Sequence, residues 1–405
     1  MLHMTTKIAG PQRGNYLELS QQDRVQLWQN PPGYIQLLNK LEVLEGAVAY
    51  GKEIAEEFEH LAVVGMGGSS LGSKALIEAL GYEEKVSFFL DTDPRYFQKR
   101  IKTLDLLKTH WIVVSKSGTT LEILALVNAI VEQLGIKGLS LERHITVLTE
   151  PKESPLKEWA IKNKITCVDH PLDIGGRFSV LSPVGMVPCA FAGLDVSKFY
   201  HGAQWVYDHP EVVEQFCAQI MESFDREEFI TVFWFYSLTM ESFGLWLNQL
   251  WAESLAKKVK ISGEEAPRVS TPYSCIGARD QHSVLQQIAE GYKDKLVCFF
   301  QVDHWEDGNH CNKNEFVEEA YLSKATLSQI YNVQALSTSE ALLEKGVNQL
   351  YFNINQLDES SLGALIFFFE TSIGVLGKLL GINPYDQPGV EAGKKIAKEK
   401  LLSVL

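Results

Sequence analysis

Short apolar runs recur along the chain after residue 60, and longer stretches with apolar residues at helical spacing separate them. The first set is rich in Val, Ile, Phe and Thr, which favour strands, and comprises residues 61–66, 85–91, 109–115, 143–149 and 165–170. Runs that are apolar at most positions indicate strands buried on both faces. Strands that alternate with helices are typical of a parallel sheet covered by helices, so we expect a parallel α/β unit here.

A second set of such runs follows at residues 229–237, 295–302 and 350–354. The pattern predicts an α/β fold with two doubly wound parallel-sheet units, each an α/β/α sandwich. We place a small unit at residues 51–195 and a large unit with C-terminal helices at residues 196–405. The seam is expected in a helix-rich crossover between Gly193 and Asp225. Residues 1–50 are expected to form a helical N-terminal segment that packs on the large unit.

Two strongly apolar segments, residues 229–255 and 362–382, resemble membrane spans at first sight. Glu241 interrupts the first, and Glu370 and Lys378 interrupt the second, so neither offers 18 uncharged residues in a row. We interpret both as core elements of the large unit.

The balance of charge argues against some ligands. The 405 residues include 37 Lys and Arg and 51 Asp and Glu, which gives a formal net charge of −14. Because nucleic acids and anionic membranes are bound by surplus Lys and Arg, we expect neither as a partner. Any anionic ligand must then be held by a local cluster of donors.

The cysteines and the first residues indicate the cellular compartment in which we expect the protein. The six cysteines show no CxxC pair and no regular spacing, which indicates reduced thiols rather than a disulfide framework. The opening stretch MLHMTTKIAGPQRG lacks the apolar core of a signal peptide, so we expect a cytoplasmic protein.

A glycine-rich loop follows the first strand of the small unit, where the sequence reads GMGGSSLG from residue 65. A loop between a strand and a helix presents free backbone N–H groups that attract an anion. Gly65, Gly67 and Asp91 give a partial dinucleotide-binding pattern, but Ser70 takes the third small position, so this match is weak. No GxxxxGK[ST] motif occurs at the loop, which excludes a Walker nucleotide site there.

A second polar loop, SKSGTT, ends the strand at residues 109–115 and leads into a helix. Its hydroxyls, backbone N–H groups and single ammonium suit a compact phosphate monoester better than an extended pyrophosphate. The alternative is that Ser and Thr only cap the following helix.

Four further stretches carry more functional groups than packing requires. Arg177 follows two glycines and is suited to stabilising negative charge on a ligand, or else lies on a tight surface turn. Glu253 lies in an otherwise apolar segment, where a carboxylate tends to have a raised pKa and can act as a base; the alternative is an exposed helix face. His282 can transfer protons near neutral pH, or it is an ordinary capping or core histidine.

The fourth stretch, NPYDQPGVEAGKK at residues 383–395, places Glu391 and Lys394 on one face of a helix, which a surface ion pair also explains. The stretch HWEDGNHC at residues 304–311 has no standard metal-ligand spacing, so we expect no metal site.

Taken in chain order, these stretches resemble the successive motifs of the glucose-6-phosphate isomerase (phosphoglucose isomerase) family. The motifs are GMGGS (65–69), SKSGTTLE (115–122), GGRFS (175–179), ES (253–254), DQHS (280–283) and DQPGVE (386–391) with Gly393 and Lys394. The first two are shared with sugar-isomerase (SIS) domains in general, and the others are specific to this isomerase family. The resemblance covers residues 60 to about 400 and is to the compact bacterial type. Ala256 departs from the glycine found in many members, which leaves the backbone geometry beside Glu253 open.

The resemblance implies an aldose–ketose isomerase of glycolysis and gluconeogenesis that interconverts glucose 6-phosphate and fructose 6-phosphate through a cis-enediol. Glu253 matches the base that moves a proton between C1 and C2, and Arg177 matches the cation that stabilises the enediol. His282 and Lys394 match the residues that open the sugar ring.

By the same resemblance, the substrate phosphate and sugar are bound by two sets of residues. The phosphate would be held by Ser115, Lys116, Ser117 and Thr120, while Gly67, Gly68 and Ser69 would line the sugar side and Gln387 would contact the substrate. No metal or other cofactor is implied. Family members are generally homodimers, and the resemblance implies that His282 enters the neighbouring subunit's site.

Three alternative functions remain at this point. A bifunctional phosphoglucose/phosphomannose isomerase would also turn over mannose 6-phosphate. A non-catalytic SIS regulator would bind sugar phosphate but would have no use for Glu253, His282 and Lys394 together. A nicotinamide-dependent oxidoreductase would rest on the weak dinucleotide pattern alone.

Overall fold

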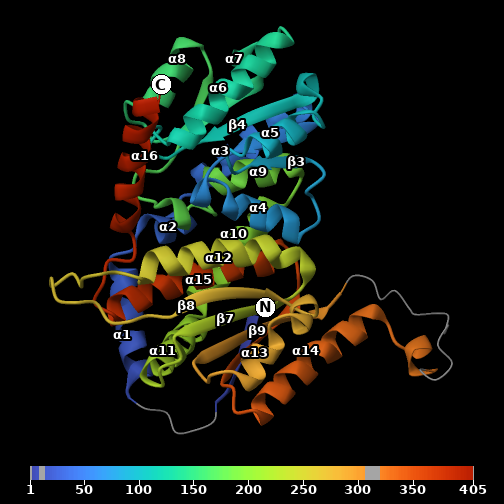
Figure 1. The fold of residues 1–405 in the computed structure, drawn as a ribbon, viewed down its shortest axis with the longest axis vertical. Helices are drawn as coiled ribbons and strands as arrows, with labels where there is room; N and C mark the ends of the chain where they lie inside the picture. Colours follow the sequence, from blue (N-terminus) through green and yellow to red (C-terminus); the bar gives the residue numbers. More distant parts are fainter. Residues whose placement is uncertain (1, 9–13, 306–319, 405) are drawn as a thin grey trace.

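The computed structural model describes residues 2–8, 14–305 and 320–404, and contains two five-stranded sheets. The small sheet has the order β3-β2-β4-β5-β6, and all its pairings are parallel (Figure 1). Its strands are β2 (His60–Val64), β3 (Val86–Phe89), β4 (Thr109–Val114), β5 (Ile145–Thr149) and β6 (Thr166–Asp169). The helices after these strands are α4 (Leu71–Ala79), α5 (Pro94–Ile101), α6 (Leu121–Ile136), α7 (Leu141–His144) and α8 (Pro155–Lys162). The first predicted α/β unit is confirmed.

The large sheet has the order β1-β10-β9-β7-β8. It contains β1 (Leu2–Lys7), β7 (Ile230–Tyr236), β8 (Thr271–Ile276), β9 (Lys295–His304) and β10 (Gln349–Gln356). β7, β9 and β10 pair in parallel, as predicted. β8, which was not predicted, pairs in parallel with β7 at one edge, and β1 runs antiparallel to β10 at the other. The fold class of two parallel-sheet α/β units is therefore confirmed.

The N-terminal segment departs from the purely helical expectation. Residues 14–57 do form helices, namely α1 (Tyr16–Gln29), α2 (Gly33–Gln36) and α3 (Leu41–Glu57). The first residues instead form β1, because the free edge of β10 offers unpaired backbone groups and an extended segment satisfies them.

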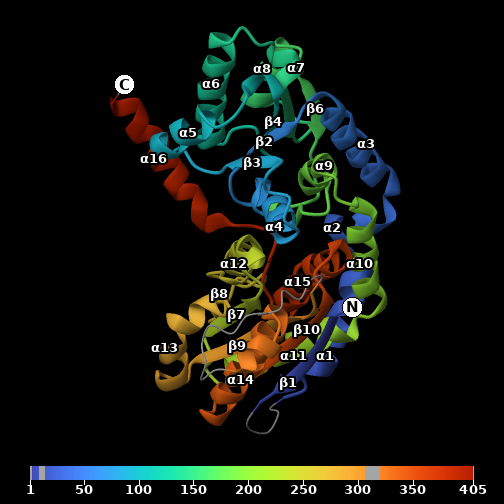
Figure 2. The same ribbon diagram turned by 90° about the vertical axis from the view of Figure 1, so that its right-hand side faces the viewer.

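Two helices, α9 and α10, lie where the small unit meets the large one. α9 (Pro183–Ala192) packs against α3 and α4, whereas α10 (Val196–Asp208) packs against α15 (Glu359–Leu379). We retain the boundary at residue 195 as a proposal, because the packing partners change there. The large unit also contains α11 (Glu211–Asp225), α12 (Glu241–Leu255), α13 (Leu285–Glu290) and α14 (Leu327–Glu344). The last helix, α16 (Glu391–Val404), leaves the large unit and runs along the outside of the small one (Figures 1 and 2).

Successive residues of the central strands belong to different hydrophobic clusters, because they point to opposite faces of the sheet. Leu61 and Val63 of β2 join a cluster shared by both units, while Ala62 and Val64 join a second cluster on the other face of the small sheet. Phe233 and Phe235 of β7 belong to the same shared cluster. Because both faces of these strands are covered, their sequences are apolar at every position rather than at every second one.

The two apolar segments are core elements, as predicted. Residues 229–255 divide into β7 and α12, and α15 occupies most of the second segment. α15 is long and apolar enough to cross a membrane, but 89% of that stretch is buried inside the protein. Its apolar surface is therefore covered by the rest of the fold.

Glu370 lies fully buried on α15, and its Oε1 atom finds no hydrogen-bond partner among the described residues. Burial raises the pKa of this carboxyl well above its ordinary value of 4.5, so the folded protein holds it protonated. At pH values between the ordinary pKa and the raised pKa, the unfolded chain has released this proton and the folded chain has not, so the free energy of unfolding falls as the pH rises.

We expect Glu370→Gln to remove this slope. Urea unfolding between pH 5 and 8 should show a variant that gains stability over the parent as the pH rises, whereas the exposed control Glu132→Gln should follow the parent at every pH. A constant difference between Glu370→Gln and the parent would show that the carboxyl is not held protonated.

Candidate active site

The two predicted loops lie at the same edge of the small sheet. β2 and β4 are parallel neighbours, so their carboxyl ends meet. The chain continues from β2 to β3 on one side and from β4 to β5 and β6 on the other. This edge is therefore the point where the strand order reverses, which is where open α/β sheets bind ligands.

The glycine loop is packed directly against two other parts of the site. It forms the short helix η2 (Gly67–Ser69), with Gly67 at φ +53°. A Cβ on Gly68 would lie 2.3 Å from the backbone of Gly176, and one on Gly67 would lie 2.6 Å from Nε2 of Gln249. The backbone contact requires glycine at position 68, and the positive φ favours glycine at position 67. The loop is thus held beside η4 (Gly176–Phe178) and α12.

The second polar loop, SKSGTT at residues 115–120, forms hydrogen bonds mainly among its own residues. Ser115 Oγ and Thr120 Oγ1 are 3.1 Å apart, and Ser115 Oγ also accepts a hydrogen bond from the N–H of Gly118 at 3.2 Å. Ser117 Oγ and Thr119 Oγ1 are 2.9 Å apart. Thr120 is the N-cap residue of α6, but its side chain makes no capping bond to the helix. The N-terminus of α6 therefore keeps N–H groups available to an anion, which favours the ligand-binding interpretation over simple capping.

Lys116 has a protein partner in the structure. Its Nζ lies 3.6 Å from Oε1 of Glu150, a buried residue directly after β5 whose Oε2 pairs with Lys152 at 3.0 Å. The sequence predicted an ammonium for the phosphate and gave no sign of this counter-ion. Lys116 thus lies at the loop with part of its charge balanced by Glu150.

Arg177 connects the elements of the site. Only 4% of the residue is exposed, and its five N–H groups all have acceptors. They bond to Ser254 Oγ at 3.0 Å, Glu253 Oε2 at 2.9 Å, Gln387 Oε1 at 2.8 Å, and the carbonyl oxygens of Pro384 at 3.0 Å and Asp386 at 3.1 Å. Burial lowers the pKa of Arg177 from its ordinary value, and the nearby carboxylates of Glu253 and Asp386 oppose that effect. Arg177 is therefore a buried part of the site and not a residue of a surface turn.

Glu253 lies in the last turns of α12 with a side chain 31% exposed. Its Oε2 accepts from Arg177, and its Oε1 accepts from Gln249 Nε2 at 3.0 Å. The expected apolar surroundings are not what the structure shows, because both oxygens are hydrogen-bonded by residues of the site. Ala256, the C-cap residue of α12, has φ −75°, which alanine adopts as readily as glycine. The departure at this position leaves Glu253 in ordinary helical geometry.

His282 is separated from Glu253 within one chain. It is exposed at the end of η6 (Arg279–His282), and Arg279 pairs with Glu241 at 2.8 Å. Glu241 is the first residue of α12 and Glu253 lies twelve residues further on, which corresponds to about 18 Å along the helix. His282 therefore lies near one end of α12 and Glu253 near the other.

Gln387 and Lys394 follow each other at the C-terminal end of the chain. Gln387 joins the site through its bond to Arg177, as described above. Lys394 lies seven residues later, at an exposed position of α16, which carries it from the large unit toward the small one (Figure 2).

Two site residues were missed at the level of sequence. Gln249 lies one helical turn before Glu253, so the i, i+4 spacing on α12 was the available signal. Lys257 donates to the carbonyl of Glu253 at 2.8 Å and pairs with Asp386 at 3.1 Å. Its nearness to residue 386 follows from the tertiary fold and has no signature in the sequence.

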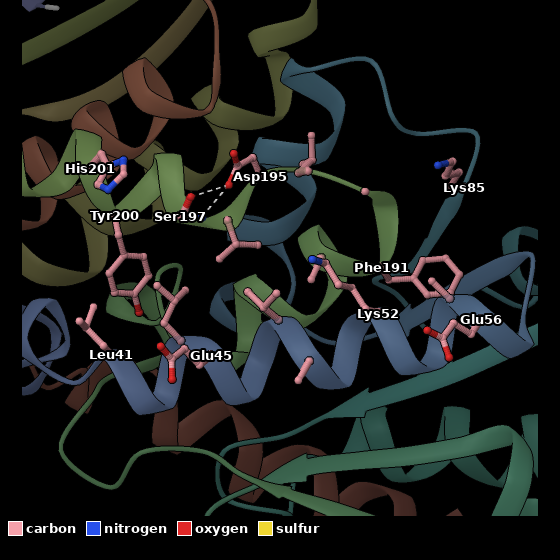
Figure 3. Close-up of a pocket in the computed structure, with 18 residues that line it drawn as sticks. Leu41, Glu45, Lys52, Glu56, Lys85, Phe191, Asp195, Ser197, Tyr200 and His201 are labelled. Carbon is pink, nitrogen blue, oxygen red and sulfur yellow. Dashed lines mark hydrogen bonds between the residues drawn. The ribbon is translucent and has the colours of Figure 1, made fainter.

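A large open groove of ≈ 1180 Å³ lies elsewhere, between α3 and the start of α10 (Figure 3). It mixes apolar residues with charges of both signs, including Glu45, Lys52 and Asp195. The bond from the N–H of Ser197 to Asp195 caps α10. None of the predicted site residues lines this groove, so it is not the candidate site.

Metal ligands do not cluster in the described part of the chain. Among those residues no group of three or more His, Cys, Asp or Glu side chains could hold a metal ion. Of the stretch 304–311, residues 306–311 lie outside the described residues.

Comparisons with known proteins show the family of the chain. Residues 35–404 match the family model described as phosphoglucose isomerase. A glucose-6-phosphate isomerase of Rubrobacter xylanophilus is 34% identical over 93% of this chain and 90% of its own length. A glucose-6-phosphate isomerase of Thermus thermophilus is 33% identical over 91% of this chain and 90% of its own length.

Solved structures give the same fold. A hypothetical protein of Thermus thermophilus superposes with a TM-score of 0.88 at 30% identity, covering 95% of each chain. A glucose-6-phosphate isomerase of Chlamydia trachomatis superposes with a TM-score of 0.79 at 24% identity, covering 90% of this chain and 73% of the other. The latter supports the fold alone.

Proposed function

Because the chain belongs to the phosphoglucose isomerase family, we propose that it interconverts glucose 6-phosphate and fructose 6-phosphate with the site around Arg177 and Glu253. The observation that carries this proposal is a carboxylate fixed by Arg177 and Gln249 beside the glycine loop at the switch point of the small sheet. A base in that position is suited to work on a small molecule whose phosphate is bound by the neighbouring loop.

In this proposal Glu253 transfers the proton between C2 and C1 of the substrate. Its carboxylate removes the proton from C2 of the open-chain aldose, the C1 oxygen gains a proton, and a cis-enediol forms. Loss of the proton on the C2 oxygen and return of the proton to C1 then give the ketose. One carboxylate serves both steps because it returns the proton it takes. The fixed charge of Arg177 favours the negative charge that develops on the enediol oxygens.

The loops and the C-terminal segment bind and open the sugar. We assign the phosphate to Ser115, Lys116, Ser117 and Thr120 at the N-terminus of α6, where the Thr120 side chain makes no capping bond and a helix N-terminus attracts anions. Gly67, Gly68, Ser69 and Gln387 line the sugar side. Lys394, with His282 from a neighbouring subunit, opens the ring.

A homodimer is part of the proposal. His282 follows three residues after Arg279, which pairs with Glu241 at the start of α12, and Glu253 of the same chain lies about 18 Å further along that helix. This placement at opposite ends of α12 supports a second copy that supplies a histidine to each site. Free and mostly buried thiols among the described cysteines fit the cytoplasm as the location.

The direct test is turnover of fructose 6-phosphate by the purified protein without added metal or nucleotide, with glucose 6-phosphate detected by a coupled assay. We expect rapid turnover and far slower turnover of mannose 6-phosphate. Comparable rates on both substrates would make the protein bifunctional. Tight sugar-phosphate binding without turnover would make it a regulator and would contradict the proposal.

A further inference from the structure

Lys257 lies beside the proposed base without any role in the proton transfer described above. Its side chain is only 6% exposed, which is unusual for a lysine. The ammonium donates to the main-chain oxygens of Glu253 at 2.8 Å and of Asp386, and pairs with the Asp386 carboxylate at 3.1 Å. Its donors thus bond to two segments that lie far apart in the sequence.

The two segments are those that carry the site. One is the C-terminal turn of α12 with Glu253, and the other is residues 383–389 with Gln387. The carbonyl of Asp386 accepts from Lys257 on one side and from Arg177 on the other. Two buried cations therefore hold residues 383–389 against α12, and the same segment leads into the helix with Lys394.

We infer that Lys257 is a positioning residue that fixes Glu253, Gln387 and the start of α16 in their working arrangement. The inference rests on the proposed isomerase activity, because that activity needs these three parts to act on one substrate. Misplacing a reacting group by about 1 Å costs up to about 10²-fold in rate. Loss of the Lys257 hydrogen bonds should therefore lower kcat more than it changes KM.

Charge gives the inference a second, independent consequence. Arg177 from η4 pairs with Glu253, the Lys257 ammonium interacts with Glu253, and Lys257 in turn pairs with Asp386 of the C-terminal segment. Burial lowers the pKa of the Lys257 ammonium, and Asp386 opposes that effect, so the ammonium is retained as part of an ion pair. Without it, Glu253 loses one of the positive charges that lie beside it and favour its carboxylate form. The acidic limb of the kcat/KM profile should then move to higher pH.

The experiment compares Lys257→Met, Lys257→Arg and the matched control Lys258→Met, whose lysine is adjacent and exposed. For Lys257→Met we expect kcat for fructose 6-phosphate to fall by about tenfold or more, while KM stays within about threefold of the parent's value. The acidic limb of its kcat/KM profile should move to higher pH. Lys257→Arg keeps the charge and should keep the parent's pH profile. Lys258→Met should match the parent in all three measures. Hydrogen exchange of residues 383–390 should be faster in Lys257→Met alone.

The outcomes separate this inference from the proposed function. An inactive parent protein would contradict the isomerase proposal, and hydrogen exchange would still decide whether Lys257 holds the segment. An active parent with Lys257→Met equal to Lys258→Met in kcat, pH profile and exchange would overturn the inference. A loss of activity with an unmoved pH limb and unchanged exchange would also overturn it, because a general loss of stability explains that result.

Discussion

Glu253→Gln is expected to lower kcat for fructose 6-phosphate by about 10³-fold or more while the substrate still binds, because an amide cannot take the proton from carbon. General base catalysis commonly contributes about 10²–10⁴-fold, and the proposed mechanism assigns the transferred proton to Glu253 alone. The measurement is steady-state kinetics of the variant together with calorimetric titration of a non-reacting sugar phosphate.

The variant should fold normally. A glutamine at position 253 can still accept from Arg177 through its oxygen, and Gln249 has a buried Oε1 without a partner that can turn to accept from the new amide. Glu264→Gln, which changes an exposed carboxylate paired with Lys260, serves as the control and should retain full activity. Near-parental kcat in Glu253→Gln would remove Glu253 from the mechanism.

Mixed dimers should recover the activity that each of two inactive variants lacks. In a heterodimer of Glu253→Gln and His282→Ala, one site combines an intact Glu253 from one subunit with an intact His282 from the other, and the second site lacks both. A purified heterodimer should therefore show about half the parental activity, and a random mixture about a quarter.

The result depends on which chain supplies the histidine. If His282 served the site of its own chain, each site of the heterodimer would carry one defect and no activity would return. Two affinity tags allow the heterodimer to be isolated, and each homodimeric variant measured alone gives the baseline. Recovery that does not rise above this baseline would contradict the shared site.

The sequence predicted every interior strand of both sheets, together with β3 and β6, the edge strands of the small sheet. β2, β4, β7 and β9 lie inside their sheets, are covered on both faces, and appear as continuous apolar runs. The two missed strands, β1 and β8, are the edges of the large sheet. β8 contains Pro272 and the exposed Tyr273, which an edge strand tolerates and a central strand would not.

The sequence likewise predicted some residues of the site and missed the partners of others. Arg177, Glu253 and Gln387 were predicted from the motifs, and the structure brings them into contact. The partners of the predicted lysine and arginine, Glu150 and Asp386, were not identified as such. Such contacts join residues that are far apart in the chain, and no local pattern of residue types encodes them.

The length of α12 sets a limit on how the chain can be altered. Each residue of an α-helix adds about 1.5 Å and turns the next side chain by about 100°, so one residue inserted after Glu241 would rotate Glu253 away from Arg177. The same insertion would change the spacing between the base and the end of the helix near His282. The turn around Val259 and Glu265 is held by an isolated bridge and lies outside both constraints. Tags, linkers and natural insertions should therefore be accommodated in that turn, whereas α12 should keep its residue count through any redesign.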